Sequence, residues 1–300
     1  MDPATTDFDY SDAVQNFAGP LRHDTYPAIA TRDVDMTGKT ILVTGASSGC
    51  GKAIVRSFAK CGASRIALLA RRDMSSLIEE ISALAQSSGR PKPHVLALRV
   101  DHTVQSQVEE GAKKFSLEFG PSLDVLVNNA ASMDPWLPIT DSHPDTWWRT
   151  WEVNVKGPYL VARSFIPFLL RSPTKTLVQI SSMAALLTRP GGSAYQGTKS
   201  ALLRLSNHLR LEYADQGLLI HNLHPGAVRT ELALTMPARF HEILVDAPEL
   251  CGDVVVWLVR ERRGWLQDRF VSAQWDVTSL EAQKERIVAG DLLRLRLVTG

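Results

Sequence analysis

The sequence predicts an α/β protein with a doubly wound parallel sheet of about seven strands flanked by helices. Two observations support this fold class. From Lys39 onward, short β-rich runs alternate with longer helical patterns, and these runs are apolar on both faces. Strands that are covered by helices on both sides have such runs, whereas half-exposed strands alternate between apolar and polar residues. Since consecutive parallel strands are joined by right-handed crossovers, very few topologies fit this pattern.

The predicted elements follow one another in a regular order. The strands are expected at residues 40–44, 65–70, 95–100, 123–127, 176–180, 218–223 and 270–273. Helical patterns lie between them at residues 52–61, 74–86, 104–119, 147–170, 193–216 and 248–259. No break in composition separates two domains. We therefore expect residues 36–300 to form one domain, with a C-terminal extension from about residue 276.

Residues 1–35 differ from the rest of the chain. They are rich in aspartate and show little periodicity, which predicts an irregular N-terminal arm. The arm contains Phe8, Tyr10, Phe17 and Tyr26, which is more aromatic surface than a disordered tail carries. We expect the arm to pack on the body of the protein or on a neighbouring subunit.

Composition excludes several classes of partner. The formal net charge is +1, so neither nucleic acid nor an anionic membrane is expected as a partner. The cysteines Cys50, Cys61 and Cys251 form no C-x-x-C pair and lie near no histidine at ligand spacing, so no metal site is expected. Their odd number suits a reducing compartment. The longest apolar runs fall far short of the ~20 residues of a membrane helix, and no signal-peptide pattern begins the chain. We expect a cytoplasmic protein.

A glycine-rich turn follows the first predicted strand. Residues 44–51 read T-G-A-S-S-G-C-G, with Gly45, Gly49 and Gly51 at the spacing G-x-x-x-G-x-G. Glycines here allow a tight turn and let the backbone approach a pyrophosphate closely, and the following helix offers free N–H groups to the phosphates. The turn therefore predicts dinucleotide binding. The alternative is a turn that serves only the close packing of helix on strand.

The end of the second predicted strand bears on the choice of dinucleotide. Ala70 stands there, followed by Arg71 and Arg72. An acidic residue would accept hydrogen bonds from the ribose 2′-OH of NAD(H), which Ala70 cannot do. The planar guanidinium of Arg71 can instead pair with a 2′-phosphate. We expect NADP(H) to be preferred, with NAD(H) possible. The alternative is an ordinary surface arginine.

A tyrosine and a lysine form the candidate catalytic pair. Tyr195 and Lys199 are four residues apart in a helical pattern, so both can reach one pocket. A cation near Tyr195 favours the phenolate and lowers its pKa from ~10. Tyr195 could then act as a general acid or base. A serine after the fifth predicted strand, Ser182 or its neighbour Ser181, could hydrogen-bond a substrate carbonyl.

Further short motifs follow the glycine turn in order. They are Asp101 after the third predicted strand, Asn-Asn-Ala at 128–130, Asn154 within W-E-V-N-V, Ser182 within I-S-S, Tyr195-x-x-x-Lys199, and P-G-A-V-R-T at 225–230. Together with the glycine turn, they resemble the short-chain dehydrogenase/reductase superfamily, in its single-domain class, over residues 38 to about 275. The resemblance implies a Rossmann fold and a homodimer or homotetramer.

The resemblance also implies roles for individual residues. The spacing to Tyr195 favours Ser182 over Ser181 as the residue that polarises the substrate carbonyl. Lys199 would hold the nicotinamide ribose, and Asn154 would hold a water that links Lys199 to solvent. Asp101 would hold the adenine amino group. The expected cofactor-binding residues are Gly45, Ser47, Ser48, Gly49, Cys50, Gly51, Arg71, Asp101, Asn128, Ala130, Tyr195, Lys199, Pro225, Gly226, Val228 and Thr230.

The sequence departs from the family pattern at two places. Cys50 stands where isoleucine or leucine is usual, and Ala131 replaces the common glycine after Asn-Asn-Ala. Neither change removes a group that the reaction needs. The arm and the C-terminal extension are longer than the family minimum and are similar to those of short-chain reductases in fungal natural-product pathways.

These observations lead to an expected function. We expect an NADP(H)-dependent ketoreductase that acts on an apolar carbonyl or alcohol, with a natural-product intermediate as a candidate substrate. Residues 231–245 contain many apolar side chains and could form a lid over the substrate, although ordinary packing of a short helix would explain them equally well. The alternatives are an NAD-dependent alcohol dehydrogenase and a non-catalytic NADP-binding scaffold or sensor.

Overall fold

The sheet of the computed structural model is parallel throughout. The structure describes residue 14 and residues 16–297, and its seven strands lie in the order β3-β2-β1-β4-β5-β6-β7. The strands are β1 (Thr40–Thr44), β2 (Arg65–Ala70), β3 (His94–Arg99), β4 (Val125–Asn128), β5 (Thr176–Ile180), β6 (Leu219–His224) and β7 (Phe270–Ser272). The prediction of a doubly wound sheet of about seven strands is confirmed.

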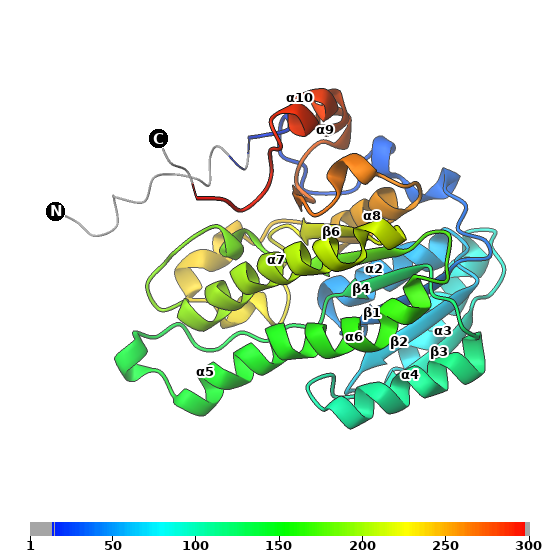
Figure 1. The fold of residues 1–300 in the computed structure, drawn as a ribbon, viewed down its shortest axis with the longest axis horizontal. Helices are drawn as coiled ribbons and strands as arrows, with labels where there is room; N and C mark the ends of the chain where they lie inside the picture. Colours follow the sequence, from blue (N-terminus) through cyan, green and yellow to red (C-terminus); the bar gives the residue numbers. More distant parts are fainter. Residues whose placement is uncertain (1–13, 15, 298–300) are drawn as a thin grey trace.

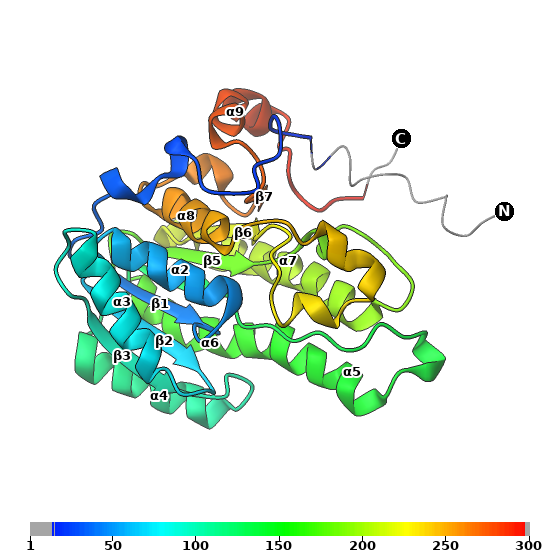
Figure 2. The ribbon, with the colours of Figure 1, turned by 180° about the vertical axis from the view of Figure 1, so that it is seen from behind.

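Helices cover both faces of the sheet. One face carries α2 (Gly49–Lys60), α3 (Ser75–Ser87) and α8 (Pro248–Val259), which lie in front in Figure 2. The other face carries α4 (Gln105–Phe119), α6 (Gly157–Leu169) and α7 (Ser193–Tyr213), which lie in front in Figure 1. The remaining helices are α5 (Pro144–Trp151), α9 (Val277–Ala282) and α10 (Lys284–Ala289).

The core is divided by the sheet into two apolar layers. The layer under α4 and α6 contains Phe115, whose ring lies 5.6 Å from that of Phe165 and 5.4 Å from that of Phe168 in edge-to-face contacts. The other layer is formed by α2, α3 and α8. Because the strands contribute side chains to both layers, their apolar runs do not alternate.

The helix predicted at residues 147–170 is interrupted in its middle. It consists of α5, a π-helical turn at Glu152–Lys156, and α6. The N–H of Gly157 reaches back to the carbonyl of Glu152, and the imidazole of His102 bonds the carbonyl of Val153 at 2.9 Å. A Cβ at Gly157 would lie 1.8 Å from the ring of His102. The segment predicted as helical is therefore helical, but it contains a π turn in its middle, and the His102 ring packs against this turn.

The described part of the N-terminal arm packs on the body of the same chain. The ring of Phe17 lies 5.3 Å from that of Trp275, and the indole N–H of Trp275 donates to the carbonyl of Val14 at 2.7 Å. Farther along, Ile29 is buried in the core under α8. The arm runs beside α8 and α9 in both ribbon views (Figures 1 and 2). Phe8 and Tyr10 lie outside the described residues.

The arm is therefore expected to contribute to stability. Ile29→Ala should lower the free energy of unfolding by about 2–4 kcal/mol, because Ile29 is 1% exposed and its truncation leaves a cavity. Chemical denaturation of both proteins measures this difference. Ile243→Ala is the matched control, since Ile243 is 57% exposed and should change the free energy by less than ~0.5 kcal/mol. If both substitutions changed the free energy of unfolding equally, the arm would not be packed as part of the hydrophobic core.

Candidate active site

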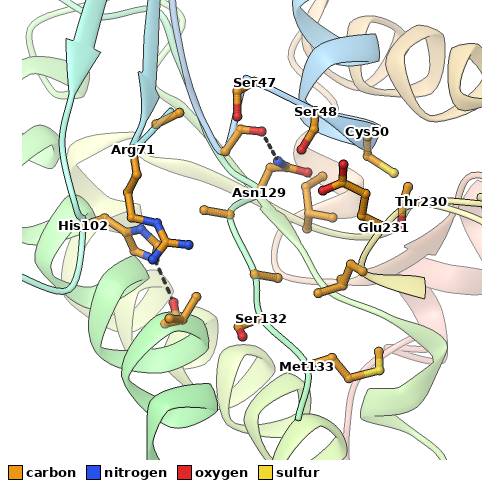
Figure 3. Close-up of a pocket in the computed structure, with 18 of the residues that line it drawn as sticks. Ser47, Ser48, Cys50, Arg71, His102, Asn129, Ser132, Met133, Thr230 and Glu231 are labelled. Carbon is orange, nitrogen blue, oxygen red and sulfur yellow. Dashed lines mark hydrogen bonds between the residues drawn. The ribbon is translucent and has the colours of Figure 1, made fainter. Parts of the chain in front are cut away.

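A cavity of about 670 Å³ opens at the carboxyl ends of the strands. Its walls come from the glycine turn after β1, the ends of β2 and β3, the loop after β4, the start of α7 and the segment after β6 (Figure 3). Parallel sheets of this type bind ligands at this edge, where the strand order reverses. The predicted site residues that line the cavity are Gly45, Ser47, Ser48, Gly49, Cys50, Arg71, Asp101, Ala130, Tyr195, Lys199, Pro225 and Thr230.

Other predicted residues lie behind this wall. They are Gly51, Asn128, Asn154, Ser182, Gly226 and Val228, none of which lines the cavity itself. Several of them shape it. A Cβ at Gly51 would lie 2.2 Å from the carbonyl oxygen of Gly45, so only glycine allows this helix start to approach the turn. The amide of Asn128 donates to the carbonyl of Pro158 at 3.4 Å, which joins β4 to α6.

The glycine turn is tied to the loop after β4. Asn129 donates from its side-chain amide to the carbonyl of Thr44 at 2.9 Å and to that of Gly45 at 3.3 Å. The hydroxyl of Thr44 accepts the backbone N–H groups of Asn129 and Ala130. Gly45 has a φ of 66°, and a Cβ there would lie 2.8 Å from the Cα of Ala130. The turn is thus a close backbone approach that fits a dinucleotide pyrophosphate, with the N-terminus of α2 facing the cavity.

One end of the cavity carries positive charge. The side chain of Arg71 is exposed and extends into the cavity beside His102 (Figure 3). Within residues 16–297, no carboxylate forms an ion pair with Arg71, whereas Arg72 pairs with Glu231 at 3.0 Å. A free guanidinium at the end of β2 fits a phosphate group.

Asp101 lies at the same end, at the close of β3. One of its oxygens accepts the N–H and O–H of Thr103 at 2.9 and 2.7 Å, and the other accepts from Arg149 at 3.0 Å. Partial burial raises the pKa of Asp101, but these hydrogen bonds outweigh it and lower the pKa to about 2. The side chain is therefore a carboxylate at neutral pH. Its expected contact with adenine stays a prediction.

Tyr195 and Lys199 lie together at the other end. The Nζ atom of Lys199 is 5.6 Å from the centre of the Tyr195 ring and donates to the carbonyl of Ile180 at 2.9 Å. The Tyr195 hydroxyl is hydrogen-bonded to Ser182. The first two turns of α7 and the residues after β5 thus bring these three side chains together, as the motifs predict.

Burial dominates the protonation of this pair. It raises the pKa of Tyr195 to about 12, with the hydrogen bond to Ser182 acting in the opposite direction, and it lowers the pKa of Lys199 to about 8. Burial therefore outweighs the other influences on the Tyr195 hydroxyl in the protein alone, and the expected lowering of its pKa by Lys199 stays a prediction. At neutral pH Tyr195 is a phenol that can donate a proton.

The two serines after β5 have different surroundings. Ser182 contacts Tyr195, and its hydroxyl also accepts the N–H of Ala184 at 3.1 Å. Ser181 lines the cavity, and its buried hydroxyl has no hydrogen-bond partner among the described residues. The sequence preference for Ser182 agrees with the contact to the phenol, while Ser181 places a second hydroxyl in the cavity wall.

Asn154 is hydrogen-bonded on both sides of its amide. It exchanges two hydrogen bonds with the backbone of Ser132, at 2.7 and 2.8 Å, and donates to the hydroxyl of Thr198 at 3.0 Å. The side chain therefore joins the π-helical turn to the loop after β4 and to α7. Its expected role in holding a water stays a prediction.

Sequence reasoning did not identify His224, at the end of β6. Its Nδ1 atom accepts the N–H of Met183 at 3.2 Å, so it supports the serine turn from behind. Burial lowers the pKa of His224 to about 4, which keeps the imidazole neutral. The sequence signal that could have identified His224 is its position at the carboxyl end of β6, directly before the Pro225-Gly226 motif.

The segment 231–245 lies over the same edge of the sheet as two short 3₁₀ helices, Ala233–Thr235 and Ala238–Ile243. Leu232 and Thr235 line the cavity, together with Met133 from the loop after β4. Phe240 packs against Trp136, with ring centres 5.4 Å apart. The segment thus lines part of the cavity and also packs against the loop after β4. That it acts as a lid stays a prediction.

Neither a metal-ligand cluster nor a membrane-spanning helix is present among the described residues. Within residues 14 and 16–297, no group of three His, Cys, Asp or Glu side chains is placed to hold a metal ion. No helix in this part of the chain is both long and apolar enough to cross a bilayer.

Comparison with known proteins gives consistent matches. The profile of the short chain dehydrogenase family matches residues 39–239. The chain is 45% identical to the short chain dehydrogenase citE of Monascus ruber over 92% of this chain and 94% of that protein. It is 38% identical to the short chain dehydrogenase andI of Emericella variicolor over 94% and 97%. Among solved structures, an alcohol dehydrogenase of Thermococcus sibiricus complexed with 5-hydroxy-NADP is 27% identical over 78% of this chain and 95% of that one, with a TM-score of 0.66.

The glycine turn is expected to tolerate no side chain at its closest approach. Gly51→Ala should lower the free energy of unfolding by about 1–3 kcal/mol and weaken NADPH binding, because the added Cβ meets the backbone of Gly45 rather than a movable side chain. Denaturation and nucleotide titration measure the two effects. Gly264→Ala is the control, since a Cβ there meets open space. A Gly51→Ala protein that binds NADPH as the wild type does would contradict the assignment.

Proposed function

The chain belongs to the short chain dehydrogenase family, and from this premise we propose that it is an NADP(H)-dependent reductase of apolar carbonyl compounds. The observation that carries the proposal is the contact of Ser182, Tyr195 and Lys199 beside a cavity whose opposite wall is the glycine turn. A structural tyrosine would need neither a buried lysine next to it nor an open cavity.

The cofactor would lie along the carboxyl edge of the sheet. The N–H groups at the start of α2 would bind the pyrophosphate, Arg71 would bind the 2′-phosphate, and Lys199 would bind the nicotinamide ribose. When bound, the reduced nicotinamide supplies the hydride. Two features favour NADP(H) over NAD(H). The guanidinium of Arg71 is free to bind a phosphate, and the last residue of β2 is Ala70 rather than an acidic residue that could bind the ribose 2′-OH. The archaeal alcohol dehydrogenase that holds 5-hydroxy-NADP supports this choice.

The protein's own residues would handle the proton. Ser182 would hydrogen-bond the carbonyl oxygen and help to carry the charge that develops there. Tyr195 would then donate its proton to the alkoxide. Burial keeps Tyr195 protonated at neutral pH, which is the state that reduction requires. Oxidation of an alcohol would use the same residues with Tyr195 as the phenolate, so an alcohol dehydrogenase is the alternative, and the cellular ratio of the cofactors decides the direction.

The substrate is proposed to be apolar. Met133 and Leu232 contribute apolar surface to the cavity. The relatives citE and andI are short chain dehydrogenases of fungi, which supports a natural-product intermediate as substrate. A non-catalytic NADP-binding scaffold is the second candidate, and it is disfavoured because a scaffold has no use for the buried Tyr195–Lys199 pair.

Arg71 should determine the preference between the two cofactors. Arg71→Ala should lower kcat/KM for NADPH about 10- to 100-fold, the effect of losing one charged hydrogen bond, and should change kcat/KM for NADH little. Steady-state kinetics with both cofactors measures the ratio. Arg72→Ala is the matched control, because Arg72 is paired with Glu231. If Arg72→Ala produced the loss and Arg71→Ala did not, the assignment would be reversed.

Tyr195 should be needed for turnover and dispensable for cofactor binding. Tyr195→Phe removes the acidic proton and should lower kcat by about 10²- to 10⁴-fold, while the Kd for NADPH stays within about twofold of the wild type. Loss of absorbance at 340 nm with a panel of ketones and aldehydes measures turnover. Tyr213→Phe, at the far end of the same helix, is the control and should retain activity. Near-normal turnover of Tyr195→Phe would exclude the mechanism.

A further inference from the structure

A buried carboxylate connects the N-terminal arm to the turn that follows β6. The side chain of Asp246 is fully buried, and its Oδ1 atom lies 2.6 Å from the Nδ1 atom of His23 in the arm. Its Oδ2 atom accepts the backbone N–H of Ala227 at 2.5 Å. Since a carboxylate only accepts hydrogen bonds, Nδ1 of His23 must be the donor.

Backbone contacts join the arm at His23, the turn at residues 225–228 and the segment at residues 246–247. The N–H of Asp246 donates to the carbonyl of Ala227 at 3.1 Å, and Val228 and Asp246 form a parallel bridge. The N–H of Ala247 donates to the carbonyl of His23 at 2.8 Å. Gly226 has a φ of 92°, and a Cβ there would lie 2.6 Å from the Oδ2 atom of Asp246. The carboxylate therefore lies directly against the turn at residues 225–228.

The arm is anchored on both sides of His23, so its position does not depend on Asp246 alone. The N–H of Arg22 donates to the carbonyl of Gln274 at 2.7 Å, and its guanidinium pairs with Asp276 at 2.7 Å. The hydroxyl of Thr25 donates to Asp253 on α8 at 2.6 Å. These contacts hold the imidazole at a defined place, where it can orient the Asp246 carboxylate.

We propose that His23 is a positioning residue for the nicotinamide half of the cofactor, acting through Asp246 on the 225–228 turn. This inference rests on the proposed function, in which Lys199 binds the nicotinamide ribose. Lys199 bonds the end of β5, and Pro225 of the turn lines the same cavity at the end of the neighbouring β6. A buried carboxylate that loses a donor leaves an acceptor unsatisfied. The carboxylate must then turn toward solvent or admit water, and the N–H of Ala227 loses its fixed partner.

The position of the turn in the sheet limits the effect to one half of the cofactor. The turn follows β6, whereas Arg71 and Asp101 follow β2 and β3, which lie beyond β1, β4 and β5 in the sheet. A disturbance at the turn should therefore weaken contacts to nicotinamide and leave those to the adenosine 2′-phosphate unchanged. A general loss of stability would weaken both.

Titration of two ligands tests this division. The ligands are NADPH and 2′,5′-ADP, which lacks the nicotinamide. For His23→Ala we expect the Kd for NADPH to rise about tenfold, and the Kd for 2′,5′-ADP to stay unchanged. His23→Asn should restore NADPH binding, because its amide N–H can stand where Nδ1 stood, whereas His23→Gln should not. Arg32→Ala is the control in the same arm and should leave both affinities unchanged, because Arg32 is exposed and pairs with the neighbouring Asp33.

Hydrogen exchange of the cofactor-free protein supplies a second readout. In His23→Ala, peptides that contain residues 225–230 should exchange faster than in the wild type, while peptides of the glycine turn should not change. The inference would be overturned if His23→Ala raised the Kd values for NADPH and 2′,5′-ADP equally, or if hydrogen exchange at residues 225–230 did not change. A wild-type protein that binds 2′,5′-ADP but shows no added affinity for NADPH and no turnover would instead overturn the proposed function, and the exchange result would still decide the role of His23.

Discussion

The hydrogen bonds between Thr44 and the Asn129–Ala130 backbone are the contact on which the site depends. They join the loops that leave β1 and β4, the neighbouring strands at which the strand order reverses. The crossovers from these strands run to opposite faces of the sheet, which opens a crevice between them. The side chain of Asn129 closes the base of this crevice by bonding the carbonyls of Thr44 and Gly45. The cavity walls, from the glycine turn to α7, are arranged around this junction.

Loss of solvent governs the chemistry within the cavity. Tyr195, Lys199 and His224 are all held toward their neutral forms by burial. Asp101 behaves differently, because it is only partly buried and accepts hydrogen bonds from Thr103 and Arg149. The site therefore has a proton-donating end under α7 and a charged end at β2 and β3. A cofactor with a neutral reduced ring and an anionic phosphate matches this polarity.

Much of the site was predictable because its residues are close in sequence to the strand ends that carry them. The glycine turn, Arg71 and the Tyr195–Lys199 pair each belong to a local motif, and a motif needs only its own strand or helix to be placed. His224, which adjoins a motif, and Asn129, which stands within one, were not chosen as site residues, because their partners Met183 and Thr44 belong to segments distant in the chain. The π-helical turn before Gly157 was not predicted, because the side chain that packs against it, His102, is distant in the chain.

By itself, the sequence determined the doubly wound sheet, its seven strands, and the identity of the residues at the carboxyl edge. Periodicity and glycine spacing are local properties, and burial on both faces of a strand is visible in its composition. Only the tertiary structure decided that burial raises the pKa of Tyr195, that Ser181 lines the cavity while Ser182 contacts the phenol, and that His23 reaches the 225–228 turn through Asp246. The physical reason is that burial and hydrogen bonding between distant segments depend on the packing of the whole chain.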